Sequence, residues 1–174
     1  DTTYGAQAYA HGHIPGALFM HLDRDLSDTP DGTNGRHPLP DPQTFADLLG
    51  SMGISNEMQI IVYDDAGGMI AARLWWMLRW LGHDRVAVLD GGIQNWQRCG
   101  HPLTTEVPAY PPATFVPQLR DWVVSTEEVL ASLPKKLFCM IEARRHERFR
   151  GENETVEPVG GRIPGSRNRY YMDN

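Results

Sequence analysis

The apolar residues of the first hundred positions follow two alternating patterns. Two short runs of apolar and β-branched residues, 58–64 and 85–90, have the composition of strands buried on both faces of a parallel sheet. Each run leads through paired glycines into a segment with apolar residues at helical spacing, 71–81 and 93–98. This order predicts right-handed βαβ units, and therefore an α/β fold whose parallel sheet is flanked by helices.

A further helix is predicted before the first of these strands. Asp41 is a favourable N-cap, and Pro42 fits the first helical position. The apolar residues that follow have helical spacing until Gly53, and they are Phe45, Leu48, Leu49 and Met52.

Beyond residue 100 the pattern changes. Residues 101–118 hold five prolines and little periodicity, which is the composition of a linker. A capping box at 125–128 then predicts the start of a helix. The short apolar run 137–142 predicts a strand that opens a second α/β unit.

A six-residue motif occurs once in each unit. Gly-His-Ile-Pro-Gly-Ala at 12–17 returns as Gly-Arg-Ile-Pro-Gly-Ser at 161–166, which is 149 positions later. This spacing is close to one domain length and too long for a solenoid repeat. In the second copy a strand and a polar helix precede the motif, whereas in the first copy that strand would end where the chain begins. We therefore expect a first domain without its first strand, and a truncated second domain.

Composition and charge exclude several classes of function. A formal net charge of −6 argues against general nucleic acid binding. The longest apolar run, 70–81, is interrupted by Arg73 and Arg79 and is shorter than the ~20 residues that span a bilayer. Cys99 and Cys139 form neither a disulfide framework nor a zinc pattern, and they suit a reducing compartment. We expect a cytoplasmic protein with no metal, cofactor, nucleic acid or membrane partner.

Six motifs occur in one order along the chain. They are Gly-His-Ile-Pro-Gly-Ala at 12–17, Ile-Val-Tyr-Asp at 61–64, Ala-Arg-Leu-Trp-Trp-Met-Leu-Arg at 72–79, Val-Leu-Asp-Gly-Gly at 88–92 with Trp96, Phe-Arg-Gly at 149–151, and Gly-Arg-Ile-Pro-Gly at 161–165. Together they resemble the two-domain rhodanese superfamily, the thiosulfate and 3-mercaptopyruvate sulfurtransferases. The resemblance implies a three-layer sandwich with a central parallel sheet. It also implies that residues 1–105 are a non-catalytic N-terminal domain, 106–119 a proline-rich linker, and 120–174 the opening part of the catalytic C-terminal domain.

The resemblance also implies a chemistry. In that superfamily a cysteine thiolate takes sulfane sulfur from a small anionic donor, thiosulfate or 3-mercaptopyruvate, as a persulfide and passes it to a thiol or to cyanide. The thiolate heads a Cys-x-x-Gly loop whose converging N–H groups lower the pKa of the thiol. In the first domain Asp64 or Asp65 holds the leading position, and a carboxylate cannot carry a transferable sulfur.

The catalytic cysteine is therefore expected beyond Asn174, in the missing remainder of the C-terminal domain, and the 174-residue chain is expected to be inactive. A second interpretation is a non-catalytic rhodanese-like module for docking or binding. Neither cysteine within the chain is predicted to be the nucleophile. Cys99 ends a helix without glycine amides around it, and Cys139 alternates with Ile141 in the predicted strand, where we expect it to be buried and inert.

Arg148 matches the arginine that anchors the carboxylate or sulfonate of the donor in the superfamily. A guanidinium can hold an oxyanion through two parallel hydrogen bonds. The alternative is a solvated helix face within the arginine-rich run 142–150. Glu157 stands where the mercaptopyruvate branch has a second anchoring arginine, and Arg162 is a candidate substitute.

His37 matches a loop histidine that the mercaptopyruvate branch brings toward the catalytic cleft, with Asp23 as its partner. A histidine can move protons near neutral pH, and a carboxylate fixes its tautomer. The alternative is a surface histidine with an unrelated aspartate. His11 and His13 form a His-x-His pair, for which packing in a turn is favoured over a metal site.

The helix predicted at 71–81 carries Trp75, Trp76 and Trp80, which we expect in the core or at a domain interface. Arg73 on the same helix is expected to form a buried ion pair near Asp64 and Asp90.

Overall fold

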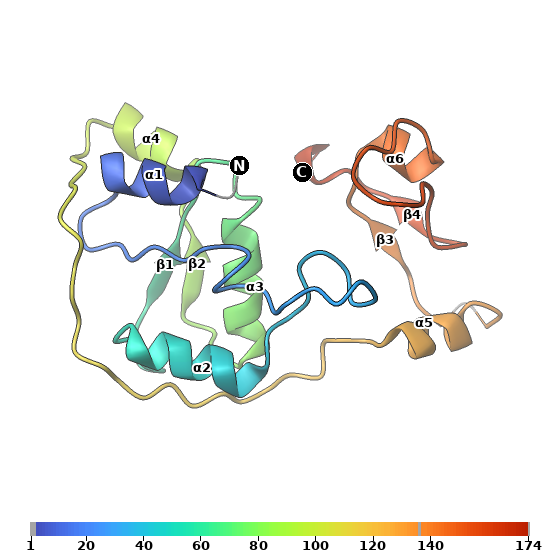
Figure 1. Ribbon diagram of the computed structural model, residues 1–174, viewed down its shortest axis with the longest axis horizontal. Coiled ribbons are helices and arrows are strands. Elements are labelled where there is room, and N and C mark those ends of the chain that lie inside the picture. Colours follow the sequence, from blue (N-terminus) through green and yellow to red (C-terminus); the bar gives the residue numbers. More distant parts are fainter. Residues whose placement is uncertain (1–2, 136, 174) are drawn as a thin grey trace. The chain divides into compact units, whose positions relative to one another are not determined.

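Two pairs of parallel strands organise the chain, one pair in each of two units. The computed structural model describes residues 3–135 and 137–173, and it divides into the units Asp1–Asp121 and Trp122–Asn174. Each unit has its own strand pair and its own helices (Figure 1).

The first unit contains the βαβ arrangement that the apolar pattern predicts. Its elements in chain order are α1 (Tyr4–His11), α2 (Pro42–Ser51), β1 (Ile60–Val62), α3 (Ala71–Trp80), β2 (Val86–Val88) and α4 (Gly92–Arg98). β1 and β2 are parallel, with Ile60 opposite Val86 and Val62 opposite Val88. Figure 1 shows the two strands side by side, with α3 next to them. The α/β class is confirmed, although each strand is shorter than its apolar run.

The start of α2 follows its sequence signals. Asp41 Oδ1 accepts hydrogen bonds from the backbone N–H of Thr44 at 2.8 Å and from its hydroxyl at 3.0 Å. Pro42, which lacks an N–H, occupies the first helical position, where that group would have no helical partner. The face of the helix toward the core then buries Phe45, Ala46 and Leu49.

The hydrophobic core lies in the first unit. Its buried members are Leu26, Phe45, Ala46, Leu49, Val62, Ala71, Met77, Leu78, Trp80, Leu81, Val86 and Phe115. Full burial of one large apolar side chain contributes roughly 1.5–3 kcal/mol. Trp80 belongs to this cluster, and Trp75 and Trp76 are partly buried against it, which agrees with their expected place in the core or at an interface.

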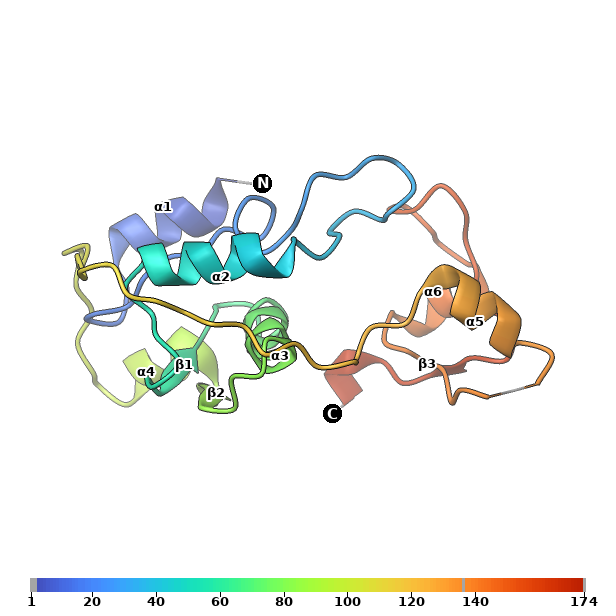
Figure 2. The same ribbon diagram turned by 90° about the horizontal axis from the view of Figure 1, so that it is seen from below.

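Residues 106–119, which have the composition of a linker, pack along the first unit. Phe115 is only 3% exposed. The N–H of Ala113 donates to the carbonyl of Gly50 at 2.9 Å, and the N–H of Gln118 donates to the carbonyl of Leu81 at 2.8 Å. Figure 2 shows this yellow segment passing along α2 and α3. The segment is therefore held by the first unit and is not a free connection.

The second unit is small and opens with the predicted capping box. Its elements are α5 (Thr126–Ser132), β3 (Ile141–Glu142), α6 (His146–Arg150), β4 (Arg167–Asn168) and the 3₁₀ helix η1 (Tyr171–Asp173). The Ser125 hydroxyl accepts the N–H of Glu128, while the Glu128 carboxylate accepts the N–H of Ser125. β3 and β4 are parallel, with Ile141 opposite Arg167.

The prediction that Cys139 is buried was wrong, because this thiol is exposed. The ordered strand begins only at Ile141, which is itself 67% exposed, and Leu137 is 65% exposed. Two strands of two residues cannot bury a layer of apolar side chains on either face. Among the described residues of this unit, none joins a buried apolar cluster.

Candidate functional site

The repeated motif forms the same turn in both units. The N–H of Ala17 donates to the carbonyl of Ile14 at 3.0 Å, and the N–H of Ser166 donates to the carbonyl of Ile163 at 3.1 Å. The last glycine of each motif has a positive φ, 81° at Gly16 and 84° at Gly165. Glycine is the residue that adopts this backbone conformation without strain. The repeat therefore has a local structural cause.

The carboxylate of Asp64 is held in a cradle of backbone N–H groups at the end of β1. Oδ1 accepts the N–H groups of Ala66 at 3.0 Å and Gly68 at 2.8 Å. Oδ2 accepts those of Ile70 at 2.8 Å and Ala71 at 2.9 Å. Converging N–H groups before the first turn of a helix form an anion-binding site. In this unit the anion is supplied by the chain itself.

The two candidates for the leading position of this loop have different roles. Asp64 fills the cradle, whereas the carboxylate of Asp65 accepts the hydroxyl of Tyr4 at 2.6 Å. This hydrogen bond, together with the negative charge of Asp65, raises the pKa of Tyr4 above its ordinary value. Asp64 is thus the residue that stands at the head of the loop, and no sulfur atom stands there.

The structure brings the predicted pair Asp23 and His37 together. Nε2 of His37 lies 3.0 Å from Oδ1 of Asp23, and the two side chains are 30% and 47% exposed. Both residues lie in the loop between α1 and α2 and line a cavity of about 980 Å³ in the first unit. A hydrogen bond of this length can fix the tautomer of the imidazole.

The expected ion pair of Arg73 was wrong. Its Nε and Nη2 donate to the carbonyl of Leu26 at 2.8 and 2.7 Å, and Nη2 also faces the carbonyls of His37 and Pro38 at 3.0 and 3.2 Å. The carboxylate of Asp64 is already satisfied by backbone N–H groups, so it is not the partner. Burial lowers the pKa of Arg73 below its ordinary value.

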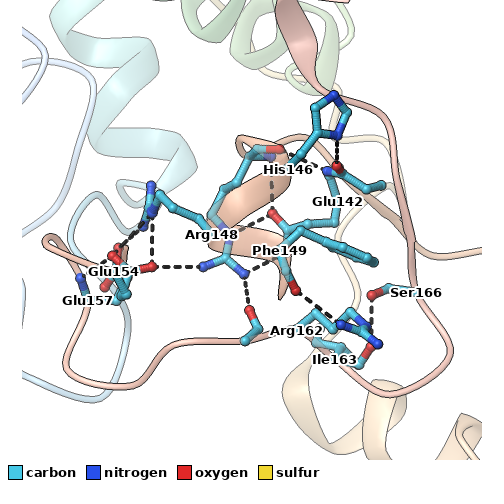
Figure 3. Close-up of polar contacts among 12 residues, drawn as sticks. Glu142, His146, Arg148, Phe149, Glu154, Glu157, Arg162, Ile163 and Ser166 are labelled. Atoms are coloured by element: carbon cyan, nitrogen blue, oxygen red, sulfur yellow. Dashed lines mark hydrogen bonds and ion pairs between the residues drawn. The ribbon is translucent and has the colours of Figure 1, made fainter. Parts of the chain in front are cut away.

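In the second unit the predicted anchor Arg148 already contacts a carboxylate (Figure 3). Its Nε donates to Oε1 and Oε2 of Glu154 at 3.1 and 2.9 Å. Its Nη2 lies 3.8 Å from Oε1 of Glu157, and within the described residues this buried nitrogen has no hydrogen-bond partner. Arg148 is therefore not simply part of a solvated helix face, since its side chain is only 19% exposed.

Glu154 gathers several donors in addition to Arg148. Its Oε1 accepts the backbone N–H groups of Val156 at 2.8 Å and Glu157 at 2.9 Å. Oε2 lies 3.6 Å from Nη1 of Arg144. The hydrogen bond from Arg148, and then those from the backbone, lower the pKa of Glu154 to about 2.

Residues 2–99 match the rhodanese-like domain family. The chain belongs to this family. A probable 3-mercaptopyruvate sulfurtransferase of Pseudomonas aeruginosa is 41% identical over 177 residues, which cover 100% of this chain and 62% of the relative. The thiosulfate sulfurtransferase of Bos taurus is 37% identical over 180 residues, covering 99% and 59%.

Solved structures agree with this assignment. The structure of the 3-mercaptopyruvate sulfurtransferase SseA of Escherichia coli has a TM-score of 0.84 at 34% identity, covering 96% of this chain and 62% of that chain. The enzyme of Leishmania major has a TM-score of 0.82 at 27% identity, covering 99% and 48%. The α/β rhodanese fold is therefore confirmed. The chain spans about 60% of the length of these two curated relatives.

Of three further candidates, Arg162 and His13 pack against aromatic rings, and Cys99 lies at the surface. The guanidinium of Arg162 lies 4.6 Å from the centre of the Phe149 ring, and its Nη1 donates to the carbonyl of Phe149 at 3.2 Å. The ring of His13 is 1% exposed and stacks on Tyr9 at 3.7 Å between centroids. Cys99 is exposed at the end of α4.

Two absences hold within the residues that the structure describes. No group of three or more histidine, cysteine, aspartate and glutamate side chains could hold a metal ion. No helix has the length and apolar character that crossing a membrane requires.

Sequence reasoning missed Glu154 and the full role of Asp64. A signal for Glu154 exists, since Glu152, Glu154 and Glu157 follow directly after the arginine-rich run. Opposite charges placed so close in sequence favour local ion pairs. For Asp64 the signal is an acidic residue between a buried strand and a helix, where side-chain capping is common.

Proposed function

We propose that the chain is part of a two-domain sulfurtransferase that moves sulfane sulfur from thiosulfate or 3-mercaptopyruvate to a thiol or to cyanide. The observation that carries the proposal is the four-amide cradle at Asp64, in a chain that matches named sulfurtransferases along its whole length. A loop of this shape suits a thiolate or persulfide anion. In the first unit Asp64 takes that place, so a cysteine outside this chain performs the transfer.

The transfer is a covalent substitution at sulfur. With thiosulfate, the catalytic thiolate bonds to the outer sulfur, the bond between the two sulfur atoms breaks, and sulfite leaves. With 3-mercaptopyruvate, the catalytic thiolate bonds to the sulfur of the donor, whose bond to carbon breaks. The proton of the donor's thiol is lost from sulfur, and the carbon that leaves gains a proton, giving pyruvate. The acceptor then bonds to the outer sulfur and restores the cysteine thiolate.

His37 and Asp23 are proposed to act at the proton-transfer step. The carbon leaving group of 3-mercaptopyruvate needs a proton, and an imidazole held by a carboxylate can supply and recover one. The 3.0 Å contact between His37 and Asp23 supports this role. Their exposed fractions leave the pair open to a further surface.

Arg148 is proposed to bind the carboxylate or sulfonate of the donor. Within the described residues its buried Nη2 has no hydrogen-bond partner, so its N–H groups are available to an oxyanion. The donor anion must compete with Glu154 and Glu157 for the guanidinium, so both glutamates are expected to weaken donor binding.

We further propose that residues 1–105 form the non-catalytic domain and 120–174 the opening part of the catalytic domain. The repeated motif forms the same turn at 12–17 and at 161–166, which supports two domains of one kind. In the second unit β4, directly after the turn, pairs with β3. In the first unit the segment after the turn, Leu18–Met20, and the strand β1 both line the 980 Å³ cavity. A strand equivalent to β3 would fit this cavity and complete the first sheet. The remainder of the catalytic domain would in the same way cover the exposed residues of β3.

A cytoplasmic location is part of the proposal, because both cysteines are free thiols. A non-catalytic docking module is the second candidate, favoured by the carboxylate at position 64.

The test compares the 174-residue chain with a longer protein that contains it. Thiocyanate is measured from thiosulfate with cyanide, and pyruvate from 3-mercaptopyruvate with a thiol. We expect turnover only in the longer protein. Loss of that turnover on replacing a cysteine beyond residue 174 supports the enzyme, and no turnover in either supports the docking module.

A further inference from the structure

The loop between α1 and α2 carries the pair Asp23 and His37, yet its residues 27–37 form no helix or strand. Most of its tip, 29–36, is exposed. Hydrogen bonds within the tip are local, such as those from the N–H groups of Thr33 and Asn34 to Asp31. A loop of this kind does not fix the position of a functional histidine by its own contacts.

The two ends of this loop are joined by a backbone hydrogen bond, from the N–H of Asp28 to the carbonyl of Pro38 at 3.1 Å, and by the side chain of Arg73. The guanidinium of Arg73, on the first turn of α3, binds the carbonyl of Leu26 with two N–H groups and the carbonyls of His37 and Pro38 with Nη2. Leu26 is 2% exposed and anchored in the core. Arg73 therefore connects the core, the Asp23 end of the loop and the backbone of His37 itself.

The chemistry of these contacts requires an arginine. A buried cation is costly unless hydrogen bonds satisfy it. Within the described residues, Arg73 forms no ion pair, and its hydrogen-bond partners are these three carbonyl oxygens. A planar guanidinium can face several acceptors at once, whereas an ammonium group is a compact point charge on a flexible stem. A charge used in this way serves to set the shape of the loop.

We propose that Arg73 is a positioning residue, which holds His37 at hydrogen-bond distance from Asp23. This inference rests on the proposed role of that pair, but the geometry that it predicts can be measured without turnover. If Arg73 only stabilised the fold, other changes of equal cost would loosen the pair to the same extent. If it positions the loop, its loss separates Asp23 from His37 while the core stays folded.

The test uses the 174-residue chain and two variants, Arg73→Met and Arg73→Lys. Proximity is read from the nuclear Overhauser effect between the ring protons of His37 and the β protons of Asp23. Accessibility is read from the rate at which diethyl pyrocarbonate modifies His37, measured by mass spectrometry with exposed His11 as internal reference. Folding is checked by circular dichroism and by the dispersion of the methyl signals of Met77 and Leu78.

In Arg73→Met we expect the Overhauser effect to vanish and the modification rate of His37 to rise about tenfold relative to His11, as for loss of hydrogen bonds to a charged group. Arg73→Lys keeps the charge without the fork, so its rate should lie between those of wild type and Arg73→Met. If Arg73→Met does not fold, the test rests on Arg73→Lys alone. A modification rate of His37 in Arg73→Lys equal to that of wild type then overturns the proposal.

Two control variants lie on the same helix. Arg79→Met removes a guanidinium that pairs with Asp84 and contacts the Trp75 ring. Leu78→Val lowers core stability at a side chain that is fully buried. Both should leave the reactivity of His37 at the wild-type value. Equal increases in Leu78→Val and Arg73→Met would show a purely structural role. The proposed proton-transfer role is tested separately by His37→Asn in the complete enzyme, so either idea can fail alone.

Discussion

The carboxylate of Glu154 lies 2.9 Å from Nε of Arg148, so the residue matched to the donor anchor is already paired with an anion of its own unit. Oε1 of Glu157 also lies 3.8 Å from Nη2 of the same guanidinium. These contacts change what the proposed anchor must do, since donor binding becomes an exchange of one oxyanion for another. The strength of the internal pair therefore limits the affinity for the donor.

The first prediction concerns this exchange in the complete enzyme. Arg148→Ala should raise KM for the donor about ten- to a hundredfold, as expected for loss of a charge-assisted bidentate contact worth roughly 1.5–3 kcal/mol. Glu154→Gln should lower KM for the same donor, because it removes the competing charge. Steady-state kinetics with varied donor and fixed acceptor measure both effects.

Arg145→Ala is the control for bulk positive charge, because Arg145 is an exposed neighbour in the same run. Its effect on KM should be small. If Arg145→Ala and Arg148→Ala give equal losses that salt abolishes, the arginines only attract anions and the anchor role must be withdrawn.

The second prediction is a pH dependence of the Glu154 cluster. The pKa of the Glu154 carboxyl group is lowered from 4.5 to about 2 in the folded chain. A lowered pKa means that the ionised group stabilises the fold at pH values above 4.5, and that this contribution is lost as the pH falls from 4.5 toward 2. The N–H groups of Val156 and Glu157, which donate to Glu154, should shift their NMR signals with a midpoint near pH 2. Signals that move with a midpoint at the ordinary value would contradict the ion pair.

The third prediction tests the cradle at Asp64. Asp64→Asn replaces one carboxylate oxygen with an amide group that cannot accept the N–H groups of its neighbours. We expect a loss of about 1.5–3 kcal/mol in the free energy of unfolding, since partly buried N–H groups lose a charged acceptor. Urea unfolding followed by tryptophan fluorescence measures the loss. Asp65→Asn, one residue away, should cost less than about 1 kcal/mol. A small effect at Asp64 would mean that water replaces the carboxylate readily.

The fourth prediction uses the same cradle as a reporter. Asp64→Cys places a thiol where four N–H groups converge, and such surroundings lower the pKa of a thiol. At slightly acidic pH the new cysteine should react with iodoacetamide faster than Cys99 and Cys139, which lie outside the cradle. Peptide mass spectrometry gives the three rates in one sample. If Cys99 or Cys139 reacts first, the cradle does not act on anions as its geometry indicates.

Signals that act over a few residues were sufficient to predict α2, α3, α4 and α5, whereas α1 was not predicted. The caps at Asp41 and Ser125 were predicted because each needs only its own side chain and an N–H three residues later. The length of the strands was not predicted. An apolar run shows where a strand can form, whereas the paired residues depend on neighbouring strands, and only three pairs join β1 to β2.

Contacts over long distances in the sequence account for the other errors. Arg73 was given a carboxylate partner because acidic residues are visible in a sequence. Its actual partners are carbonyl oxygens, and every residue has one. The burial of Cys139 was inferred from alternation along a strand, but alternation shows only which side chains share a face. Whether that face is covered depends on the rest of the sheet.

The candidate site was predicted in part. Asp23 and His37 are fourteen positions apart in an irregular loop, and their pairing came from the resemblance, since no periodicity relates them. The structure places them 3.0 Å apart. Their roles, and that of Arg148, stay predictions that the experiments above can decide.

The carboxylate in the Asp64 cradle is covalently tied to the loop that surrounds it. A loop that folds around a diffusible anion gains or loses stability as the concentration of that anion changes. The stability of this loop cannot change in that way, because the Asp64 carboxylate is always present in the cradle. The first unit should therefore keep one shape at the start of α3, whether or not sulfur donors are abundant in the surrounding solution.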